Sequence, residues 1–147
     1  MHFEGTVSIN ASRDKVWRFL TDAHAVSQCA PGIESIEIIT PNEKFRAVAS
    51  VGFGSIKVTF IMEVEWLELD APNRSTMKAH GTAPGSAMDM TSEMRLADGP
   101  DGSTELKWAA DVTILGTIVS VAARLMGSVT QKLAGAFFNS VKKQIEA

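Results

Sequence analysis

The chain has 147 residues, with 14 lysines and arginines against 17 aspartates and glutamates, which gives a formal net charge of −3. This length fits one domain spanning residues 1–147, large enough to bury about 68–70% of its unfolded surface without disulfides or metals. The single cysteine, Cys29, excludes an intramolecular disulfide framework, and the lack of a basic block excludes the electrostatic footprint of a nucleic-acid-binding protein.

The first residues, MHFEGTVSIN, lack the basic segment and apolar core that together mark a secretory signal. No apolar run approaches the roughly 20 residues that span a bilayer, because Arg124, Gln131 and Lys132 interrupt the best candidate. We therefore expect a cytoplasmic protein that is not an integral membrane protein.

The N-terminal part begins with a strand pattern and continues with two short helices. Residues 2–10 alternate between apolar and polar side chains, as a half-buried strand does. A helix follows, capped by Asn10 or Ser12, and its pattern stops by Asp22. A second helical turn over residues 24–28 then leads to a Pro-Gly turn at residues 31–32.

From residue 33 to residue 115 the apolar side chains recur at every second position, which predicts six strands. Turn-forming residues separate the six runs, at 41–42, 52–54, 70–73, 83–85 and 98–102. The clearest strand is residues 56–66, in which apolar residues alternate from Ile56 to Trp66.

The C-terminal stretch, residues 116–147, is the one long helical pattern. Its apolar side chains recur at spacings of three or four and share one helical face. They are Ile118, Ala122, Met126, Val129, Leu133, Phe137, Val141 and Ile145. Because residues 117–121 include several β-branched side chains, we expect the helix to begin between Thr117 and Ala122, with a kink at Gly127 as an alternative.

The predicted order is therefore strand, two short helices, six strands and one long helix, an α+β arrangement. An antiparallel sheet with one apolar face must bury that face against another element. The long C-terminal helix is the available cover, and we expect the two short helices to plug one end of the curved sheet.

The order and lengths of these elements resemble the helix-grip fold of the START-like (SRPBCC, Bet v 1-like) superfamily, which has a curved antiparallel sheet of about seven strands. The segments GTVSINASRDKVWRFLTD, QCAPGIESIE and QKLAGAFF resemble the carbon monoxide dehydrogenase G-subunit family. That resemblance implies a partner of molybdenum-containing carbon monoxide dehydrogenases and related hydroxylases, acting in maturation, membrane attachment or lipid and quinone handling. It also implies a location peripheral to the inner face of the membrane.

The residue types argue against catalysis and against a metal site. The three histidines, His2, His24 and His80, lie in separate predicted elements, whereas metal binding or a catalytic triad needs convergent side chains. Cys29 has no second cysteine near it, so we interpret it as a structural residue beside the Pro-Gly turn. We therefore expect no catalytic residue and no enzyme.

Two pairs of carboxylates, Asp89 with Glu93 and Glu63 with Glu65, lie on the polar faces of their strands. Such positions favour solvated ion pairs across the sheet rather than acid-base chemistry. The expected partners are Lys57, Lys78, Arg95 and Lys107.

The methionines point to a cavity. Most fall on the predicted inward faces, and their unbranched, polarizable side chains suit either an irregular core or a variable apolar ligand. A helix across a curved sheet leaves space between the two, so we predict a ligand site there. Its candidate walls are Phe45, Phe60, Met62, Met77, Met88, Met90, Trp108, Met126, Val129, Leu133 and Phe137. We expect Phe53 to be exposed at a mobile hairpin tip that serves as the entrance loop.

Three functions follow from this interpretation. The first is a non-catalytic accessory protein whose cavity binds a lipid or quinone-like molecule, with no other cofactor; the quinone rests on the resemblance. The second is a docking or maturation module for the molybdenum enzyme without its own ligand, using an apolar patch at Ile118, Val119, Val121 and Ala123. The third, a small cyclase or hydrolase, is disfavoured because the inward positions are almost all apolar.

Overall fold

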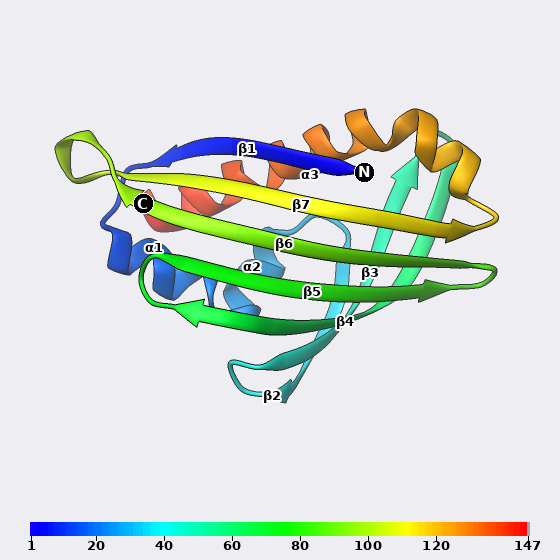
Figure 1. Ribbon diagram of the computed structural model, residues 1–147, viewed down its shortest axis with the longest axis horizontal. Coiled ribbons are helices and arrows are strands. Elements are labelled where there is room, and N and C mark those ends of the chain that lie inside the picture. Colours follow the sequence, from blue (N-terminus) through cyan, green and yellow to red (C-terminus); the bar gives the residue numbers. More distant parts are fainter. Residues whose placement is uncertain (147) are drawn as a thin grey trace.

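The computed structural model describes residues 1–146 as one curved sheet with three α-helices (Figure 1). The elements are β1 (His2–Ile9), α1 (Arg13–Leu20), α2 (Ala23–Cys29), β2 (Ile33–Thr40), β3 (Lys44–Phe53), β4 (Ile56–Asp70), β5 (Arg74–Ala83), β6 (Ser86–Asp98), the 3-10 turn η1 (Pro100–Gly102), β7 (Thr104–Gly116) and α3 (Val119–Glu146). The predicted order of strand, two helices, six strands and one helix is confirmed.

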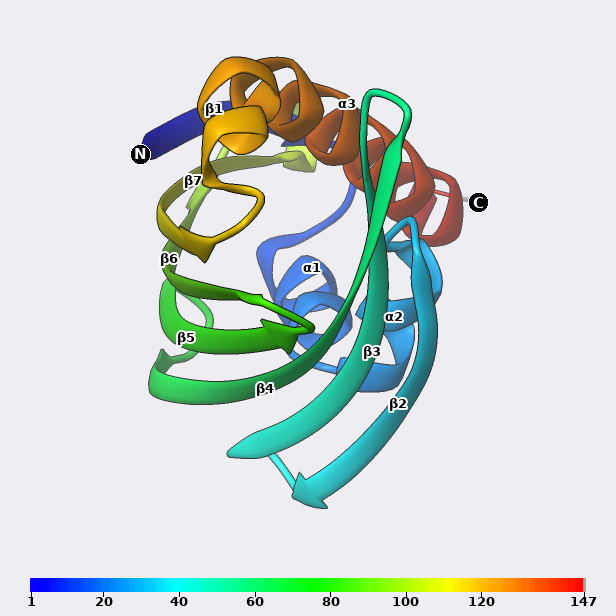
Figure 2. The same ribbon diagram turned by 90° about the vertical axis from the view of Figure 1, so that its right-hand side faces the viewer.

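The seven strands form one antiparallel sheet in the order β1-β7-β6-β5-β4-β3-β2. Strands β2 to β7 follow one another as hairpins, and β1 joins the opposite edge by pairing with β7, His2 opposite Asp111. The sheet is strongly curved, and Figure 2 shows α3 lying across its open side, with the β3–β4 hairpin bent towards the helix.

The two short helices have defined caps. The Ser12 side chain accepts a hydrogen bond from the backbone N–H of Lys15 at 3.3 Å and caps α1, so of the two predicted caps Ser12 is the one used. Asp22 caps α2 because its side chain accepts hydrogen bonds from the backbone N–H groups of His24 and Ala25. Helix α1 buries Val16 and Leu20, which fixes it against one end of the sheet.

Helix α3 begins at Val119, inside the predicted window, and continues for 28 residues. The helix continues through Gly127 as one element. A helix of this length spans about 42 Å, which is enough to cross the sheet from the β3–β4 hairpin to α1. Its buried residues come from both ends, Ala122 and Met126 near the start and Val141 and Ile145 near the end.

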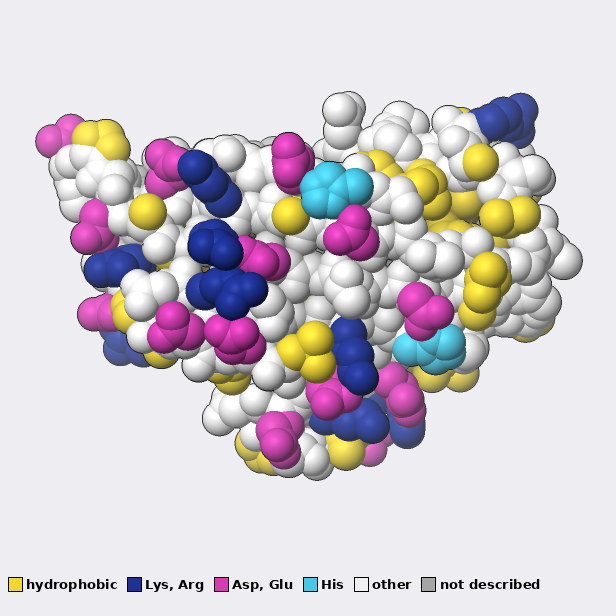
Figure 3. Space-filling model, in the orientation of Figure 1, with side chains coloured by type: hydrophobic (Ala, Val, Ile, Leu, Met, Phe, Trp, Pro, Cys, Tyr) yellow, Lys and Arg dark blue, Asp and Glu magenta, His cyan; other side chains and the backbone are white. Residues whose placement is uncertain are grey.

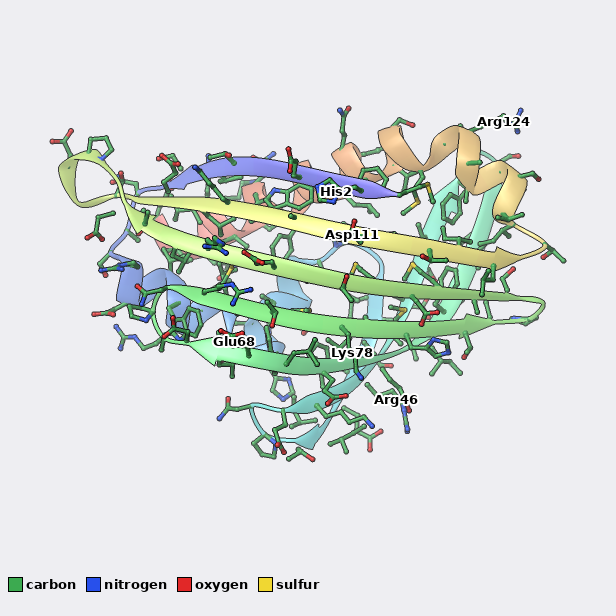
Figure 4. The ribbon with its side chains drawn as sticks, in the orientation of Figure 1. His2, Arg46, Glu68, Lys78, Asp111 and Arg124 are labelled. Carbon is green, nitrogen blue, oxygen red and sulfur yellow. The ribbon has the colours of Figure 1, made fainter. Side chains whose placement is uncertain are left out.

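The convex face of the sheet carries charged side chains of both signs (Figure 3). Figure 4 labels Arg46, Lys78 and Asp111 on this face. Ion pairs join Arg46 to Glu63 (3.2 Å), Lys78 to Glu65 (3.7 Å), His80 to Asp89 (2.6 Å), Lys107 to Glu105 (3.8 Å) and Arg95 to Glu93. All four of the predicted carboxylates are therefore paired across strands at the surface, Glu93 with Arg74 as well as with Arg95 of its own strand. Of the predicted partners, Lys78 and Arg95 are used, whereas Arg46, Arg74 and His80 were not predicted and Lys107 pairs with Glu105 instead.

The concave face is apolar and has two parts. At the end nearest α1, the last turns of α3 pack tightly on the sheet, and Ile9, Leu106, Val141 and Ile145 are at most 2% exposed. Towards the β3–β4 hairpin, α3 rests on Phe53, and many inward side chains between these contacts are only half-buried. None of the helices within residues 1–146 combines the length and the apolar character needed to cross a bilayer.

Candidate ligand cavity

A cavity of about 500 Å³ lies between the concave face of the sheet and the helices α2 and α3. Strands β3 to β7 form its floor, β1 contributes to one side, and the middle of α3 forms the roof. Most side chains around it are apolar, because every second residue of each strand points inward and these positions carry Met, Phe, Val, Ala or Trp.

The structure brings together nearly all of the predicted wall residues. The cavity is lined by Phe45, Phe60, Met62, Met77, Met88, Met90, Trp108, Met126, Leu133 and Phe137. Val129 is not among the lining residues, contrary to the prediction. It packs instead against the cluster around Phe53 and Ala122, and the helix presents Thr130 and Ala134 to the cavity at the neighbouring positions. Helical periodicity identified the correct face of α3 but not its exact rotation.

The prediction that Phe53 is exposed is wrong. Its side chain is 2% exposed and packs with Val112 and Met126, while it also lines the cavity. Strand β3 continues as far as Phe53, so Phe53 points inward, as Val51 does two residues earlier. The β3–β4 hairpin also bends towards the first turns of α3, and these cover the ring. The turn itself consists of the exposed Gly54 and Ser55.

Small residues on the sheet make room for the cavity. Ala47, Ala79 and Gly81 occupy inward positions in the middle of β3 and β5. Gly81 lies directly opposite Met62, and a Cβ added at Gly81 would collide with the Met62 sulfur. The methionine therefore lies over the space that a side chain at position 81 would fill.

Trp108 forms the cavity wall nearest β1. Its indole ring lies over Gly5, where a Cβ would come within 2.7 Å of the indole Nε1, so glycine is required for this packing. The ring also packs against Phe138 of α3, with ring centroids 6.4 Å apart. The two glycines therefore differ in what packs on them, which is a rigid ring at Gly5 and a flexible thioether at Gly81.

Some lining residues were not predicted. Phe3, Ala23 and Val26 come from β1 and α2, and only the folded chain brings them to the sheet. Two others, Ser75 and Ser92, had a signal in the sequence, because they share the inward alternation of the methionines on their strands. A pattern based on hydrophobicity does not identify them, because their side chains are polar.

Glu93 is the one ionisable residue among those that line the cavity, but its side chain points to the opposite, convex face of the sheet. There its carboxylate accepts hydrogen bonds from Arg74 at 3.1 Å and from Arg95. These hydrogen bonds lower the pKa of Glu93 below its ordinary value, so the carboxylate is charged and paired at neutral pH.

The other candidate reactive groups lie elsewhere. Cys29 is buried in the core at the α1 end, and burial raises the pKa of its thiol, which keeps the sulfur protonated. His24 and His80 are exposed, and His2 makes contacts on the convex face with Asp111 at 2.9 Å. Within residues 1–146, no three His, Cys, Asp or Glu side chains are grouped closely enough to hold a metal ion.

Two further recesses lie on the surface. One, of about 400 Å³, opens between the α1–α2 connection and the β2–β3 turn and shares Ala23, Phe45 and Trp66 with the cavity walls. The shared residues make this recess a candidate opening to the cavity. The other, of about 470 Å³, lies on the convex face among charged side chains such as Lys78 and Asp89.

A curved seven-stranded antiparallel sheet, covered by a long C-terminal helix around an apolar cavity, defines a START-like helix-grip fold. The chain belongs to the CoxG family, described as the G subunit of carbon monoxide dehydrogenase, whose model matches residues 5–146. Together, the family and the fold suggest a ligand-binding accessory role. No curated protein sequence shows significant similarity to the chain.

Solved structures share this fold. A conserved protein from Geobacillus kaustophilus is similar with a TM-score of 0.91 and 21% identity, over 99% of this chain and 95% of that one. The Zhui aromatase/cyclase from Streptomyces sp. R1128 is similar with a TM-score of 0.75 and 21% identity, over 99% and 93%. A START superfamily protein from Mycobacterium smegmatis is similar with a TM-score of 0.69 and 16% identity, over 99% and 97%.

Proposed function

We propose that this protein is a non-catalytic accessory protein that binds a lipid or quinone-like molecule in the cavity beneath α3. It serves a carbon monoxide dehydrogenase or a related molybdenum hydroxylase, and it carries no other cofactor. The enzyme partner and the quinone rest on the family, whereas the apolar character of the ligand rests on the cavity itself.

The observation that carries this proposal is the apolar cavity of about 500 Å³. This volume lies within the range of roughly 300–1,000 Å³ that small-molecule sites occupy. Its methionines, among them Met77, Met88 and Met90, are flexible enough to adapt to ligands of different outline. They face inward yet are only half-buried, because α3 does not press on the middle of the sheet.

The residues around the cavity favour binding over chemistry. A cyclase or hydrolase needs a positioned acid, base or nucleophile that touches its substrate. Here the carboxylate of Glu93 is tied to two arginines, and His2, His24 and His80 are absent from the lining. Because one protein of similar fold is an aromatase/cyclase, the absence of catalysis is tested together with binding.

The test of ligand binding begins with protein purified from its native host. Mass spectrometry after denaturing extraction is expected to find a co-purified lipid or quinone. In the Leu133→Trp variant the indole occupies the cavity, so the amount of this molecule per protein is expected to fall at least about tenfold. The matched control is Lys132→Trp, which adds the same ring at an exposed position of the same helix.

The result has clear alternatives. Equal amounts of lipid in both variants would exclude the cavity as its binding site. A co-purified molecule that the protein converts into a second product on incubation would overturn the non-catalytic assignment.

The docking alternative has one specific observation in its favour. Leu115 and Val119, at the junction of β7 and α3, are 55% and 49% exposed, which is unusual for large apolar side chains. Ala123 is also exposed, whereas Ile118 and Val121 of the predicted patch are half-buried against the cluster around Phe53. We expect a Val119→Asp change to reduce recovery of molybdenum hydroxylase subunits in a pull-down from the native host, whereas Ser120→Asp serves as control. Equal recovery by both variants would remove this surface from consideration. A cytoplasmic location, which rests on the N-terminal residues and the single cysteine, and a contact with the inner face of the membrane, which rests on the family resemblance, stay predictions.

A further inference from the structure

Two hydroxyl groups interrupt the apolar wall of the cavity on neighbouring strands. Ser75 on β5 is only 4% exposed, and Ser92 on β6 is half-buried. Both residues line the cavity, and both occupy inward positions that the alternation of their strands otherwise gives to methionine or alanine.

Neither hydroxyl group has a hydrogen-bond partner among residues 1–146, although most serines in the interior of proteins do. Neither oxygen is among the fully buried, unpartnered side-chain atoms of these residues, so both hydroxyl groups are accessible from the cavity. A serine in such a position is explained when a bound molecule supplies the missing hydrogen bond.

The strand register places the two hydroxyl groups close together. Ser75 lies opposite Met94, and Ser92 lies opposite Met77, so the two serines are diagonal neighbours on the same face of the sheet. Each hydroxyl can donate one hydrogen bond and accept two. Together they present donors and acceptors to the polar end of a ligand, where they can donate to a carbonyl oxygen or exchange hydrogen bonds with a hydroxyl group.

The charges around this position define the class of ligand further. The ionisable residues adjacent to the serines are Arg74 beside Ser75 and Glu93 beside Ser92, and their side chains point to the convex face, where they pair with each other and with Glu68 and Arg95. A carboxylate or an amine on the ligand would therefore be buried without an available counter-ion, which is strongly unfavourable. The group that the serines bind is neutral.

We propose that Ser75 and Ser92 form a hydrogen-bonding site that selects apolar molecules carrying a neutral carbonyl or hydroxyl oxygen over pure hydrocarbons and over carboxylates. This inference rests on the proposed function, because it assumes that the cavity takes an apolar molecule. The two serines would bind the polar atom of that molecule, and ligands with a charged group would be excluded.

The test uses three probes of nearly the same shape with the full chain. Acetylnaphthalene carries a carbonyl, ethylnaphthalene has a methylene in its place, and naphthoate carries a charge. Calorimetric titration of the wild-type protein is expected to show binding of the first two and weak or no binding of naphthoate. Ser75→Ala is expected to weaken acetylnaphthalene binding by roughly three- to tenfold, the range for one net hydrogen bond, and to leave ethylnaphthalene within about twofold.

Controls separate recognition from structural damage. Ser8→Ala changes an exposed serine of β1 and is expected to alter neither affinity. The unfolding temperature of ligand-free Ser75→Ala is expected to equal or exceed that of the wild type, because the native hydroxyl makes no hydrogen bond. A role in folding would instead lower it.

Each contrary outcome has a distinct meaning. Equal losses for acetylnaphthalene and ethylnaphthalene, or no loss for either, would overturn the serine site and leave the proposed cavity function intact. Naphthoate binding as tight as that of acetylnaphthalene would overturn the neutral ligand class. Failure of all three probes to bind the wild-type protein would overturn the proposed function, and this inference with it.

Discussion

The two parts of the interface between α3 and the sheet use similar apolar residues to opposite effect. At the α1 end, Val141 and Ile145 meet Ile9 and Leu106 and leave almost no exposed surface. In the middle, the helix stands away from the sheet and a cavity remains. One amphipathic helix therefore packs tightly on the sheet through its last turns and covers a cavity with its middle.

The difference arises from the side chains on the sheet. The closed part is built from Leu and Ile, whose few rotamers pack densely against the helix. The open part combines Met with small residues such as Ala79 and Gly81, which leave space and tolerate movement. Substitutions in the two parts are therefore expected to separate stability from binding.

The largest expected effect is a loss of stability at the closed end. Leu106→Ala removes a fully buried side chain and is expected to lower the free energy of unfolding by about 2–5 kcal/mol. Met90→Ala acts on a half-buried cavity residue, so less apolar surface is lost, and we expect a cost below about 1.5 kcal/mol. Urea denaturation of both variants measures the difference, and equal losses would contradict the division into two parts.

The second comparison uses the two glycines under Trp108 and Met62. Gly5→Ala forces a Cβ against an indole that Phe138 holds in place, and we expect a loss of about 1–3 kcal/mol from overpacking. Gly81→Ala meets a flexible thioether, which can move into the cavity, so its stability loss is expected to stay below about 1 kcal/mol. We expect Gly81→Ala to weaken the binding of acetylnaphthalene more than Gly5→Ala does. A larger loss of binding in Gly5→Ala would contradict the position of the cavity beside Met62.

We expect a smaller effect on the free energy of unfolding from a change of pH that protonates Glu93. This residue lies on β6 between the closed and the open part of the interface. Hydrogen bonds from Arg74 and Arg95 lower the pKa of this carboxyl in the folded protein. Its contribution to stability is therefore present above the ordinary pKa of about 4.3 and is lost as the pH falls through the lowered value. Glu93→Gln is expected to be less stable than the wild type at neutral pH and to approach it near pH 3, as measured by urea midpoints.

The smallest effect concerns His2, at the β1 edge of the sheet. Hydrogen bonds to Asp111 and Glu4 raise the pKa of His2 above its ordinary value. The stabilisation is complete below the ordinary pKa of about 6.5 and is lost as the pH rises through the raised value. We expect the unfolding temperature of His2→Gln to fall slightly below that of the wild type near pH 5.5 and to match it near pH 9. A difference that persists at high pH would exclude an ionic origin.

The sequence predicts the fold well because its periodicities are long and clean. The alternation from Ile56 to Trp66 and the helical spacing from Ala122 to Ile145 define the faces that meet. For the same reason the methionines of β4, β5 and β6 are placed correctly around the cavity. Register is not encoded in periodicity, so the approach of α2 and β1 to the cavity could not be predicted.

The errors have physical causes. Phe53 was interpreted as an exposed loop residue because glycines flank it, yet tertiary packing extends β3 to this position and buries the ring. Val129 lies at the edge of the apolar face of α3, where a small rotation of the helix decides whether a side chain faces the cavity. Ser75 and Ser92 follow the inward alternation but are polar, and hydrophobicity alone does not reveal such residues.

The pairing of β1 with β7 imposes an order of events while the protein is being made. The first strand must wait until residues about 100 positions later have been synthesised, and α3 emerges only after β7. At translation rates of roughly 5–20 residues per second, the apolar face formed by β3 to β6 exists for seconds before the helix can cover it. During that interval the inward methionines of this sheet stay open to solvent on the side that α3 later covers.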